Sequence, residues 1–482
     1  MRPKSLSILV GSIAVLALGA ADLSQAKGPA TERPNLVIIH ADELNLDVLG
    51  CYGGKIVGTP NIDWLAEHGA KCTRFYATTP VCSPSRAAFV SGLYPHHTRV
   101  TTNDIPLDDH IVTFAAELAR AGYATGYAGK WHLDGPGKPQ WAPKRKFGFQ
   151  DNRYMFNRGH WKKMEDTPAG PRVAARNAKG QPTYSLDGAD ASSYTTDWLT
   201  TKTLDFIAEH ASEPFCFMVS IPDPHDPNTV RPPYDTMYAN VEVPIPANMH
   251  KKPEQIPNWG RPEERVTEAT LRRIMPAYYG MVKCIDDNVG RILKELRKHN
   301  LLEKTIIVFT ADHGDLCGEH GRLNKGVPYE KSARIPFVIY YPPKIPAGTV
   351  VDKVLTCVDF KPTILSLMGV KETSPSHGRD ASALFEGKPI PGWHDVAIIR
   401  GTNPWLCAIS GDYKLVVSAV DRPWLFDLVK DPLELENQAD KPEYREVVVK
   451  LAREIVAYGK KYDDPYLANE NIKASLDSIL GK

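Results

Sequence analysis

Short apolar runs alternate with longer amphipathic stretches along most of the chain. Such runs are typical of buried strands, and stretches with helical periodicity are typical of helices packed on one face. Their regular alternation predicts an α/β fold with a large, mostly parallel central sheet flanked by helices. We expect this domain to cover residues 33–390.

Four of the apolar runs lead directly into polar side chains. The runs cover residues 36–39, 124–128, 215–221 and 306–309. Ligands of open α/β sheets bind outside the carboxyl ends of the strands. We therefore expect the polar side chains to converge on one edge of the sheet. In chain order they are Asp42 and Glu43, Lys130 and His132, His225, and Asp312 and His313.

The remaining pattern of this domain contains two expected loops and one long helix. Residues 133–193 and 226–262 are polar, contain many glycines or prolines, and are weakly periodic. They predict long surface loops. A helical pattern over residues 265–299 is interrupted by Pro276, because proline lacks an N–H and its ring clashes with the preceding turn.

The pattern changes near the end of the chain. Short strand candidates follow one another closely after residue 393, and a single helical pattern covers residues 443–458. Gly411 and Asp412 are typical of a turn between two of these strands. These features predict a C-terminal subdomain over residues 391–482, with a small antiparallel sheet and one helix packed on it.

The first residues have the pattern of a signal peptide, which we assign to residues 1–26. Arg2 and Lys4 precede a mostly apolar stretch, and Ser24-Gln25-Ala26 is a small-x-small cleavage motif. A membrane anchor is the alternative, but the apolar stretch is short for a bilayer. We expect a periplasmic or secreted protein with no membrane contact after cleavage.

Charge and cysteine usage narrow the class of protein further. The formal net charge is +1, and removal of residues 1–26 leaves a neutral chain. Such a chain offers no general attraction to nucleic acid, so we expect no nucleic-acid partner. Eight scattered cysteines form no Cys-x-x-Cys pair. An exported location permits disulfides, but the sequence leaves their pairing open.

One cysteine lies in a specific motif. Residues 82–86 read Cys-Ser-Pro-Ser-Arg, the pattern that directs conversion of Cys82 to formylglycine. A second segment, residues 122–133, reads GYATGYAGKWHL. Together they resemble the two signature segments of the sulfatase family, the type I formylglycine-dependent enzymes of the alkaline phosphatase superfamily. The resemblance covers nearly the whole mature chain except the two long loops.

The resemblance implies a nucleophile at position 82. A formylglycine hydrate carries two hydroxyls on one carbon, so that one attacks the sulfate ester and the other later expels sulfate. Pro84 and Gly92 suit the beginning and end of a helix. Residue 82 is then expected at a helix N-terminus, which favours anions. Arg86, one turn later, is expected to contact a sulfate oxygen or the hydrate.

The resemblance also implies a metal site and a set of sulfate-binding groups. Asp42, Glu43, Asp312 and His313, with an oxygen of modified Cys82, are expected to hold one divalent cation. Calcium suits such oxygen ligands, and the imidazole leaves Mg²⁺ or Mn²⁺ open.

Four further residues receive roles from the family. Lys130 and Lys325 are expected to bind sulfate, and His132 is expected to take a proton from the second hydroxyl. The general acid is His225 or Lys325, and the sequence leaves this choice open.

The implied activity is hydrolysis of sulfate monoesters, with sulfated carbohydrates as the expected substrates. The saccharide is suggested by a basic segment over residues 153–179, whose cations suit an anionic sugar. Trp393, Asn403 and Trp405 could also reach the pocket. A formylglycine-generating maturation enzyme is an expected partner. Two alternatives remain: a phosphonate monoester or phosphodiester hydrolase of the same superfamily, and a non-catalytic glycan-binding protein.

Overall fold

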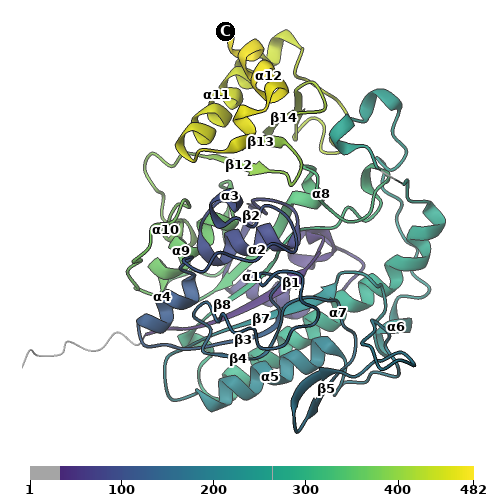
Figure 1. Ribbon diagram of the computed structural model, residues 1–482, viewed down its shortest axis with the longest axis vertical. Coiled ribbons are helices and arrows are strands. Elements are labelled where there is room, and N and C mark those ends of the chain that lie inside the picture. Colours follow the sequence, from purple (N-terminus) through teal and green to yellow (C-terminus); the bar gives the residue numbers. More distant parts are fainter. Residues whose placement is uncertain (1–32, 263) are drawn as a thin grey trace, which may run out of the picture.

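A nine-stranded sheet forms the centre of the protein, with helices on both faces (Figure 1). The computed structural model describes residues 33–262 and 264–482. The strand order is β10-β2-β9-β8-β1-β7-β3-β4, with β11 also paired to β2. The strands are β1 Asn35–Asp42, β2 Ala70–Tyr76, β3 Ala124–Lys130, β4 Asp151–Phe156, β7 Phe215–Pro224, β8 Thr305–Ala311, β9 Arg334–Tyr340, β10 Thr349–Val351 and β11 Leu355–Thr356.

Most neighbours in this sheet are parallel, which confirms the predicted fold. Strand β1 pairs in parallel with β7 and β8, and β3 pairs in parallel with β7 and β4. Only β9 runs against its neighbours β2 and β8. Every residue of β1, β7 and β8 is buried, because helices cover both faces of the sheet.

The helices around this sheet differ greatly in length. The two longest, α5 and α7, pack against each other. The helices are α1 Pro60–His68, α2 Cys82–Ser91, α3 Pro95–Thr98, α4 Phe114–Arg120, α5 Thr195–Glu209, α6 Tyr234–Met237, α7 Glu268–Lys298, α8 Glu330–Ala333, α9 Phe360–Leu367 and α10 Ser382–Phe385.

Two sequence predictions about this domain are wrong. Helix α7 continues through Pro276, since its long buried face packs against α5 and α6 and outweighs one lost hydrogen bond. Residues 133–193 are only partly loop, because they contain the edge strand β4 and a hairpin of β5 Met164–Thr167 and β6 Gly170–Val173. The charged residues of β4 concealed its strand pattern.

The C-terminal part forms a separate antiparallel sheet, as predicted (Figure 1). Its strands are β12 Val396–Arg400, β13 Trp405–Ser410, β14 Tyr413–Ser418 and β15 Trp424–Asp427. Helix α11 Arg445–Lys461 packs on β13 and β14. A second helix, α12 Glu470–Leu480, was not predicted, although its buried Ile472, Leu476 and Ile479 have helical spacing.

A buried lysine joins the two sheets. The Nζ of Lys414, on β14, lies 2.7 Å from Glu330 Oε1 and 2.8 Å from Glu434 Oε1, and donates to the carbonyl oxygen of Pro328 at 2.8 Å. The backbone N–H of Glu330 donates to Glu434 Oε2 at 2.7 Å. The C-terminal sheet therefore holds the segment that follows Lys325.

Replacing Lys414 by Met is expected to destabilise the protein by about 3–5 kcal/mol, because two buried carboxylates lose their cation. The midpoint of urea unfolding measures this. Lys430→Met is the control, because Lys430 is 71% exposed and its Nζ lies 3.6 Å from Asp427 Oδ2, so its charge remains in contact with solvent. Equal midpoints for the two variants would contradict the assigned role of Lys414.

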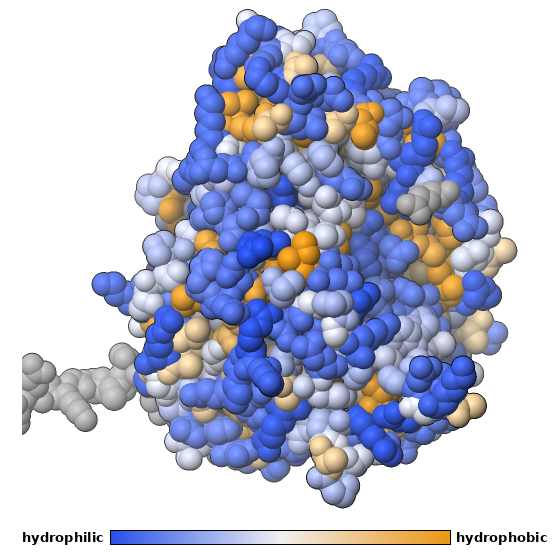
Figure 2. All heavy atoms as spheres, viewed as in Figure 1, coloured by the Kyte–Doolittle hydropathy of each residue, from blue (hydrophilic) through white to orange (hydrophobic). Residues whose placement is uncertain are grey.

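The exterior is mostly polar. Polar and charged residues cover most of the face in Figure 2, with apolar residues in separate patches. Across residues 33–262 and 264–482, no helix is long and apolar enough to cross a bilayer. All eight cysteines are free thiols. The signal peptide predicted for residues 1–26 lies outside the described residues.

Candidate active site

Cys82 is the first residue of α2, at the carboxyl edge of the central sheet. Every residue of α2 is buried, and Gly92 ends the helix in the left-handed conformation with φ 72°. A side chain at position 82 therefore faces the N–H groups and the positive dipole end of a helix. The expected placement of residue 82 at a helix N-terminus is correct.

Positive groups surround the Cys82 sulfur. Sγ lies 3.1 Å from His313 Nε2 and 3.7 Å from Lys130 Nζ, and Asp42 Oδ1 is 3.8 Å away. Burial raises the pKa of the thiol, but Lys130, Lys325 and His313 together lower it well below its ordinary value. The pocket thus stabilises negative charge on this side chain. In a matured protein, an oxygen of formylglycine would stand where Sγ stands.

Arg86 connects the ends of the strands around Cys82. Its Nε donates to Asp312 Oδ2 at 2.9 Å, and its Nη1 donates to the Lys130 carbonyl oxygen and to Ser220 Oγ, each at 2.7 Å. The Arg86 side chain is only 3% exposed. These bonds orient the carboxylates, so Arg86 acts on the site mainly through its neighbours.

Four predicted metal ligands gather at one point. The ligand atoms of Asp42, Cys82, Asp312 and His313 all lie within 4.8 Å of one another, and all four residues are buried. His313 Nδ1 lies 3.0 Å from the Gly314 carbonyl oxygen. A proton on Nδ1 would leave the Nε2 lone pair directed at the group. Two carboxylates, an imidazole and an oxygen at position 82 form a suitable donor set for a divalent cation.

The electrostatics of this group also favour a cation. Burial, with the nearby Asp42 charge, raises the pKa of Asp312. Burial alone lowers the pKa of His313, but Asp312 and Cys82 raise it to about 9. Both shifts have the same cause, which is negative charge held in a buried place.

Glu43 does not join this group. The chain takes a positive φ of 62° at Glu43, immediately after β1. Glu43 Oε2 lies 2.8 Å from both His225 Nε2 and Lys325 Nζ, while its backbone N–H donates to Asp312 Oδ1 at 3.1 Å. The geometry assigns Glu43 to the pair His225 and Lys325 instead.

Lys130 and His132 both reach residue 82 but have different partners. Lys130 is completely buried, and its Nζ forms an ion pair with Asp42 Oδ2. His132 adjoins Cys82 and is one of the groups that lower the pKa of the thiol. Its Nε2 lies 3.0 Å from Asp104 Oδ1. Asp104 thus orients the ring of His132, a role the sequence did not reveal.

His225 and Lys325 lie together at the mouth of the site. Lys325 Nζ is 2.8 Å from His225 Nε2, and His225 Nδ1 is 2.8 Å from Asp226 Oδ1. Burial lowers the pKa of His225, but the Glu43 carboxylate and the bond to Asp226 raise it well above its ordinary value. The Glu43 carboxylate and Asp226 thus favour the protonated form of His225.

His160 is a further site residue that sequence reasoning missed. Its Nε2 lies 2.8 Å from Lys130 Nζ, and its ring stacks on His225 with centroids 3.5 Å apart. Burial and the Lys130 charge lower the pKa of His160 well below its ordinary value, which favours the neutral ring. Because β4 ends at Phe156, His160 follows a parallel strand like the other site residues. Recognising β4 would have identified it.

Most of the basic segment 153–179 is already paired within the protein. Arg153 pairs with Asp151, and Arg172 pairs with Glu165. Lys162 is completely buried and lies 2.7 Å from Asp223 Oδ1. These charges support the fold, so the segment offers less to a saccharide than its composition suggests.

The aromatic and amide residues predicted near the substrate separate into two places. The guanidinium of Arg379 lies over the ring of Trp393, with its carbon 4.5 Å from the ring centroid. Asn403 and Trp405 line a groove together with Lys325. Only the second group is therefore placed to meet a substrate.

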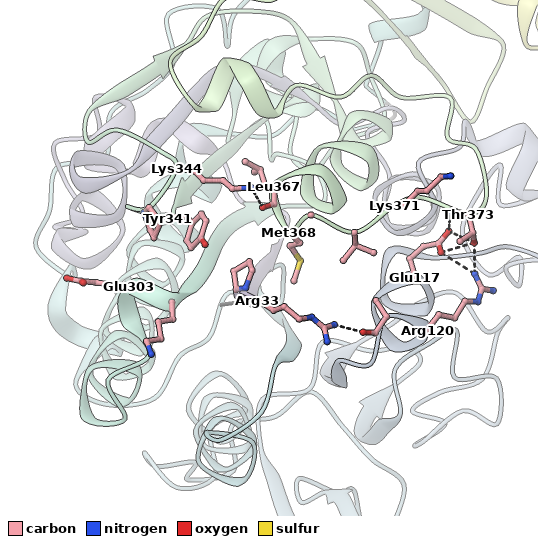
Figure 3. Close-up of a pocket in the computed structure, with 16 residues that line it drawn as sticks. Arg33, Glu117, Arg120, Glu303, Tyr341, Lys344, Leu367, Met368, Lys371 and Thr373 are labelled. Atoms are coloured by element: carbon pink, nitrogen blue, oxygen red, sulfur yellow. Dashed lines mark hydrogen bonds and ion pairs between the residues drawn. The ribbon is translucent and has the colours of Figure 1, made fainter. Parts of the chain in front are cut away.

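Another pocket lies at the opposite edge of the sheet (Figure 3). Pro34 and Lys304, which line it, precede the first residues of β1 and β8. Glu117 is bonded to Thr373 and Arg120 there, and Lys344 donates to the carbonyl oxygen of Leu367. These bonds support the fold, and the reactive side chains lie at the other edge.

Comparison with known proteins agrees with this geometry. The sulfatase family model matches residues 34–370, and the model of the N-sulphoglucosamine sulphohydrolase C-terminal region matches residues 318–461. An arylsulfatase of Clostridium perfringens is 29% identical over 88% of this chain and 94% of its own length. An N-acetylglucosamine-6-O-sulfatase of Bacteroides thetaiotaomicron is 26% identical over 94% of this chain and 91% of its own.

Solved structures are similar over the same span. A Bacteroides fragilis structure described as a sulfatase matches with a TM-score of 0.76 and 26% identity, over 91% of this chain and 98% of that one. The phosphonate monoester hydrolase of Agrobacterium radiobacter matches with a TM-score of 0.71 and 26% identity, over 90% and 97%. Since the family model covers well over half of its residues, this chain is an enzyme of the sulfatase family.

Proposed function

We propose that this enzyme hydrolyses sulfate monoesters of carbohydrates, with residue 82 as formylglycine and one divalent cation beside it. The observation that carries the proposal is the set of groups around Cys82: two carboxylates, His313 and Lys130, all at the N-terminus of α2. Lys130 and His313 stabilise negative charge at position 82, as an oxygen nucleophile requires, and the two carboxylates would hold the cation. The relative that acts as an N-acetylglucosamine-6-O-sulfatase supports a sugar substrate.

Formylglycine and a divalent cation would supply chemistry that the twenty amino acids lack. A formylglycine hydrate supplies a nucleophile that can afterwards expel sulfate, and a bound cation supplies Lewis acidity. Asp42, Asp312, His313 and an oxygen of residue 82 would hold the cation. Calcium is the expected ion because oxygen ligands predominate, and His313 leaves Mg²⁺ and Mn²⁺ open.

The other side chains bind sulfate and move protons. Lys130 and Lys325 both lie near residue 82 and would neutralise the charge of the sulfate group. His132, oriented by Asp104, would accept a proton from the hydroxyl at position 82. His160 would hold Lys130 in place through the contact between Nε2 and Nζ.

His225 is the better candidate for the general acid. Glu43 raises the pKa of both His225 and Lys325, against the effect of burial. An ammonium group starts from a much higher ordinary pKa than an imidazolium, so His225 releases its proton more readily. Its proton would go to the leaving oxygen of the sugar.

The variant Glu43→Gln is expected to shift the basic limb of the pH profile to lower pH. His225 must be protonated to act as an acid, so the rate falls as pH rises through its pKa. Loss of the Glu43 carboxylate lowers that pKa. The pH dependence of kcat with a sugar sulfate as substrate measures the shift of the basic limb. Glu209→Gln, at a 61% exposed carboxylate, is the control, and an unmoved limb would contradict the role of His225.

A phosphonate monoester hydrolase is the second candidate function, because such an enzyme shares this fold at 26% identity. Turnover of 4-nitrophenyl sulfate, 4-nitrophenyl phenylphosphonate and a 4-nitrophenyl phosphodiester distinguishes a sulfatase from a phosphonate monoester hydrolase. The proposal expects the highest kcat/KM with sulfate, and higher still with one member of a panel of sulfated sugars. A preference for phosphonate would overturn it. Binding of sulfated sugars without turnover would favour a glycan-binding protein.

Maturation and location belong to the same proposal. The Cys-Ser-Pro-Ser-Arg motif would be read by a formylglycine-generating enzyme, and the pattern of residues 1–26 supports export to the periplasm or the medium. Expression with and without such a maturation enzyme tests the first of these statements.

A further inference from the structure

A groove of about 960 Å³ lies directly beside Lys325. Four segments line it: the chain before and at the start of α7, the segment around Lys325, the loop between β12 and β13 of the C-terminal sheet, and Val420 between β14 and β15. Its volume is within the range of small-molecule binding sites. Because Lys325 Nζ lies 2.8 Å from His225 Nε2, the groove adjoins the place where the leaving group of a substrate would sit.

The charged residues of the groove are mostly cationic. Among the described residues, Arg261, Arg265, Arg322 and Lys325 line it, against the single carboxylate of Glu264. An excess of one sign on a concave surface raises the local concentration of ligands of the opposite sign. The groove therefore favours an anion in addition to the sulfate bound at residue 82.

Arg265 is the residue best placed to bind that anion. It is exposed, and it forms no ion pair within the described part of the chain. Arg261 already donates to Asn258 Oδ1, and Arg322 donates to the carbonyl oxygens of Gly260 and Arg261. A planar guanidinium without an ion-pair partner can bind a carboxylate or a sulfate through two parallel hydrogen bonds.

The opposite wall suits a sugar rather than a simple anion. Asn403 is exposed there and offers an amide that can both donate and accept hydrogen bonds. The buried Trp405 forms the apolar floor behind it. A second cavity of about 450 Å³ lies across Asn324, so there is room for a chain of more than one sugar unit.

We propose that Arg265 binds a second anionic group, a carboxylate or a sulfate, on an adjacent sugar of the saccharide whose sulfate ester lies at residue 82. This inference rests on the proposed function and narrows it to polyanionic oligosaccharides. The side chain acts on specificity, since it lies in the groove and outside the group around residue 82.

Competition kinetics test the proposal with defined oligosaccharides. Turnover of 4-nitrophenyl sulfate is measured with three inhibitors: a chondroitin sulfate tetrasaccharide, a hyaluronan tetrasaccharide that carries only carboxylates, and neutral chitotetraose. The two acidic sugars are expected to inhibit and the neutral one is not. Inhibition by hyaluronan identifies the carboxylate as the second anion, and its absence identifies the sulfate.

Arg265→Gln is expected to raise the inhibition constant of the chondroitin sulfate tetrasaccharide about tenfold. The KM for 4-nitrophenyl sulfate should change much less, because this substrate does not reach the groove. Arg272→Gln is the matched control, because Arg272 is 51% exposed on α7, shortly after Arg265 in the chain, but pairs with Glu268 and lines neither cavity. Equal inhibition constants for wild type and Arg265→Gln would overturn the proposal.

Calorimetric titration of the same tetrasaccharide separates this inference from the proposed function. Binding to Cys82→Ala protein is compared with binding to the double variant that also carries Arg265→Gln. Weaker binding by the double variant supports the groove even if no sulfate ester is turned over, and equal binding overturns it. Absence of turnover would count against the proposed function alone.

Discussion

Cys82→Ala is expected to lower sulfate-ester hydrolysis by about 10⁴-fold or more, because it removes the precursor of the nucleophile. Alanine fits the space of the cysteine at the first position of α2, so the fold should persist. Release of inorganic sulfate from 4-nitrophenyl sulfate and from a sugar sulfate measures the loss. Circular dichroism checks that the protein remains folded.

A second thiol provides the control for this variant. Cys357 is also buried, and its Sγ lies 3.5 Å from the Oγ of Ser85 on α2. Burial raises the pKa of Cys357 to about 12, which makes it an unreactive thiol. Cys357→Ala should therefore keep its activity within a few-fold. Full activity of Cys82→Ala would show that residue 82 is not the nucleophile.

Cys82→Ser distinguishes a simple alkoxide from a formylglycine hydrate. Serine retains an oxygen that can attack, but its sulfate ester has no second hydroxyl to expel the sulfate. We expect at most one equivalent of product per enzyme, with the protein gaining the mass of a sulfate group. Sustained turnover by this variant would contradict the need for a hydrate.

Removal of divalent cations is expected to lower activity by about 10³-fold, because Lewis-acid stabilisation contributes several kcal/mol to such reactions. Asp42 and Asp312 are completely buried and lie close together, so loss of a cation leaves only Lys130 and Arg86 to offset their repulsion. We therefore expect a lower thermal midpoint for the cation-free protein.

Treatment with EDTA followed by dialysis, with elemental analysis of the product, gives the cation-free protein. Activity and thermal midpoint are measured before and after addition of Ca²⁺, Mg²⁺ or Mn²⁺. EDTA saturated with calcium in advance is the control for the chelator itself. Restoration by calcium at the lowest concentration would support the oxygen-rich ligand set. Full activity without any cation would contradict the metal site.

The placement of the site could be predicted because the strands that carry it are buried on both faces. Continuous apolar runs in β1, β3, β7 and β8 are visible in sequence, and parallel strands bring their carboxyl ends to one edge. Asp42, Lys130, His225 and Asp312 therefore meet although they are far apart in the chain.

The parts that sequence reasoning missed depend on tertiary contacts. Glu43 has a positive φ, and its carboxylate contacts His225 while the other four expected ligands form a group without it. His160 was hidden because β4 is a half-polar edge strand. Lys162 looked like a free surface charge, whereas its partner Asp223 lies on β7, 61 residues later. Charge in a sequence does not reveal which charges are already paired.

The state of residue 82 tests the central claim most directly. After expression with a formylglycine-generating enzyme, free thiols are alkylated, because cysteine and hydrated formylglycine have nearly equal masses. The tryptic peptide from Phe75 to Arg86 is then weighed. The proposed function predicts the mass of the aldehyde or its hydrate, with no alkylation at position 82. A fully alkylated Cys82, in cells that convert a control sulfatase, would contradict it.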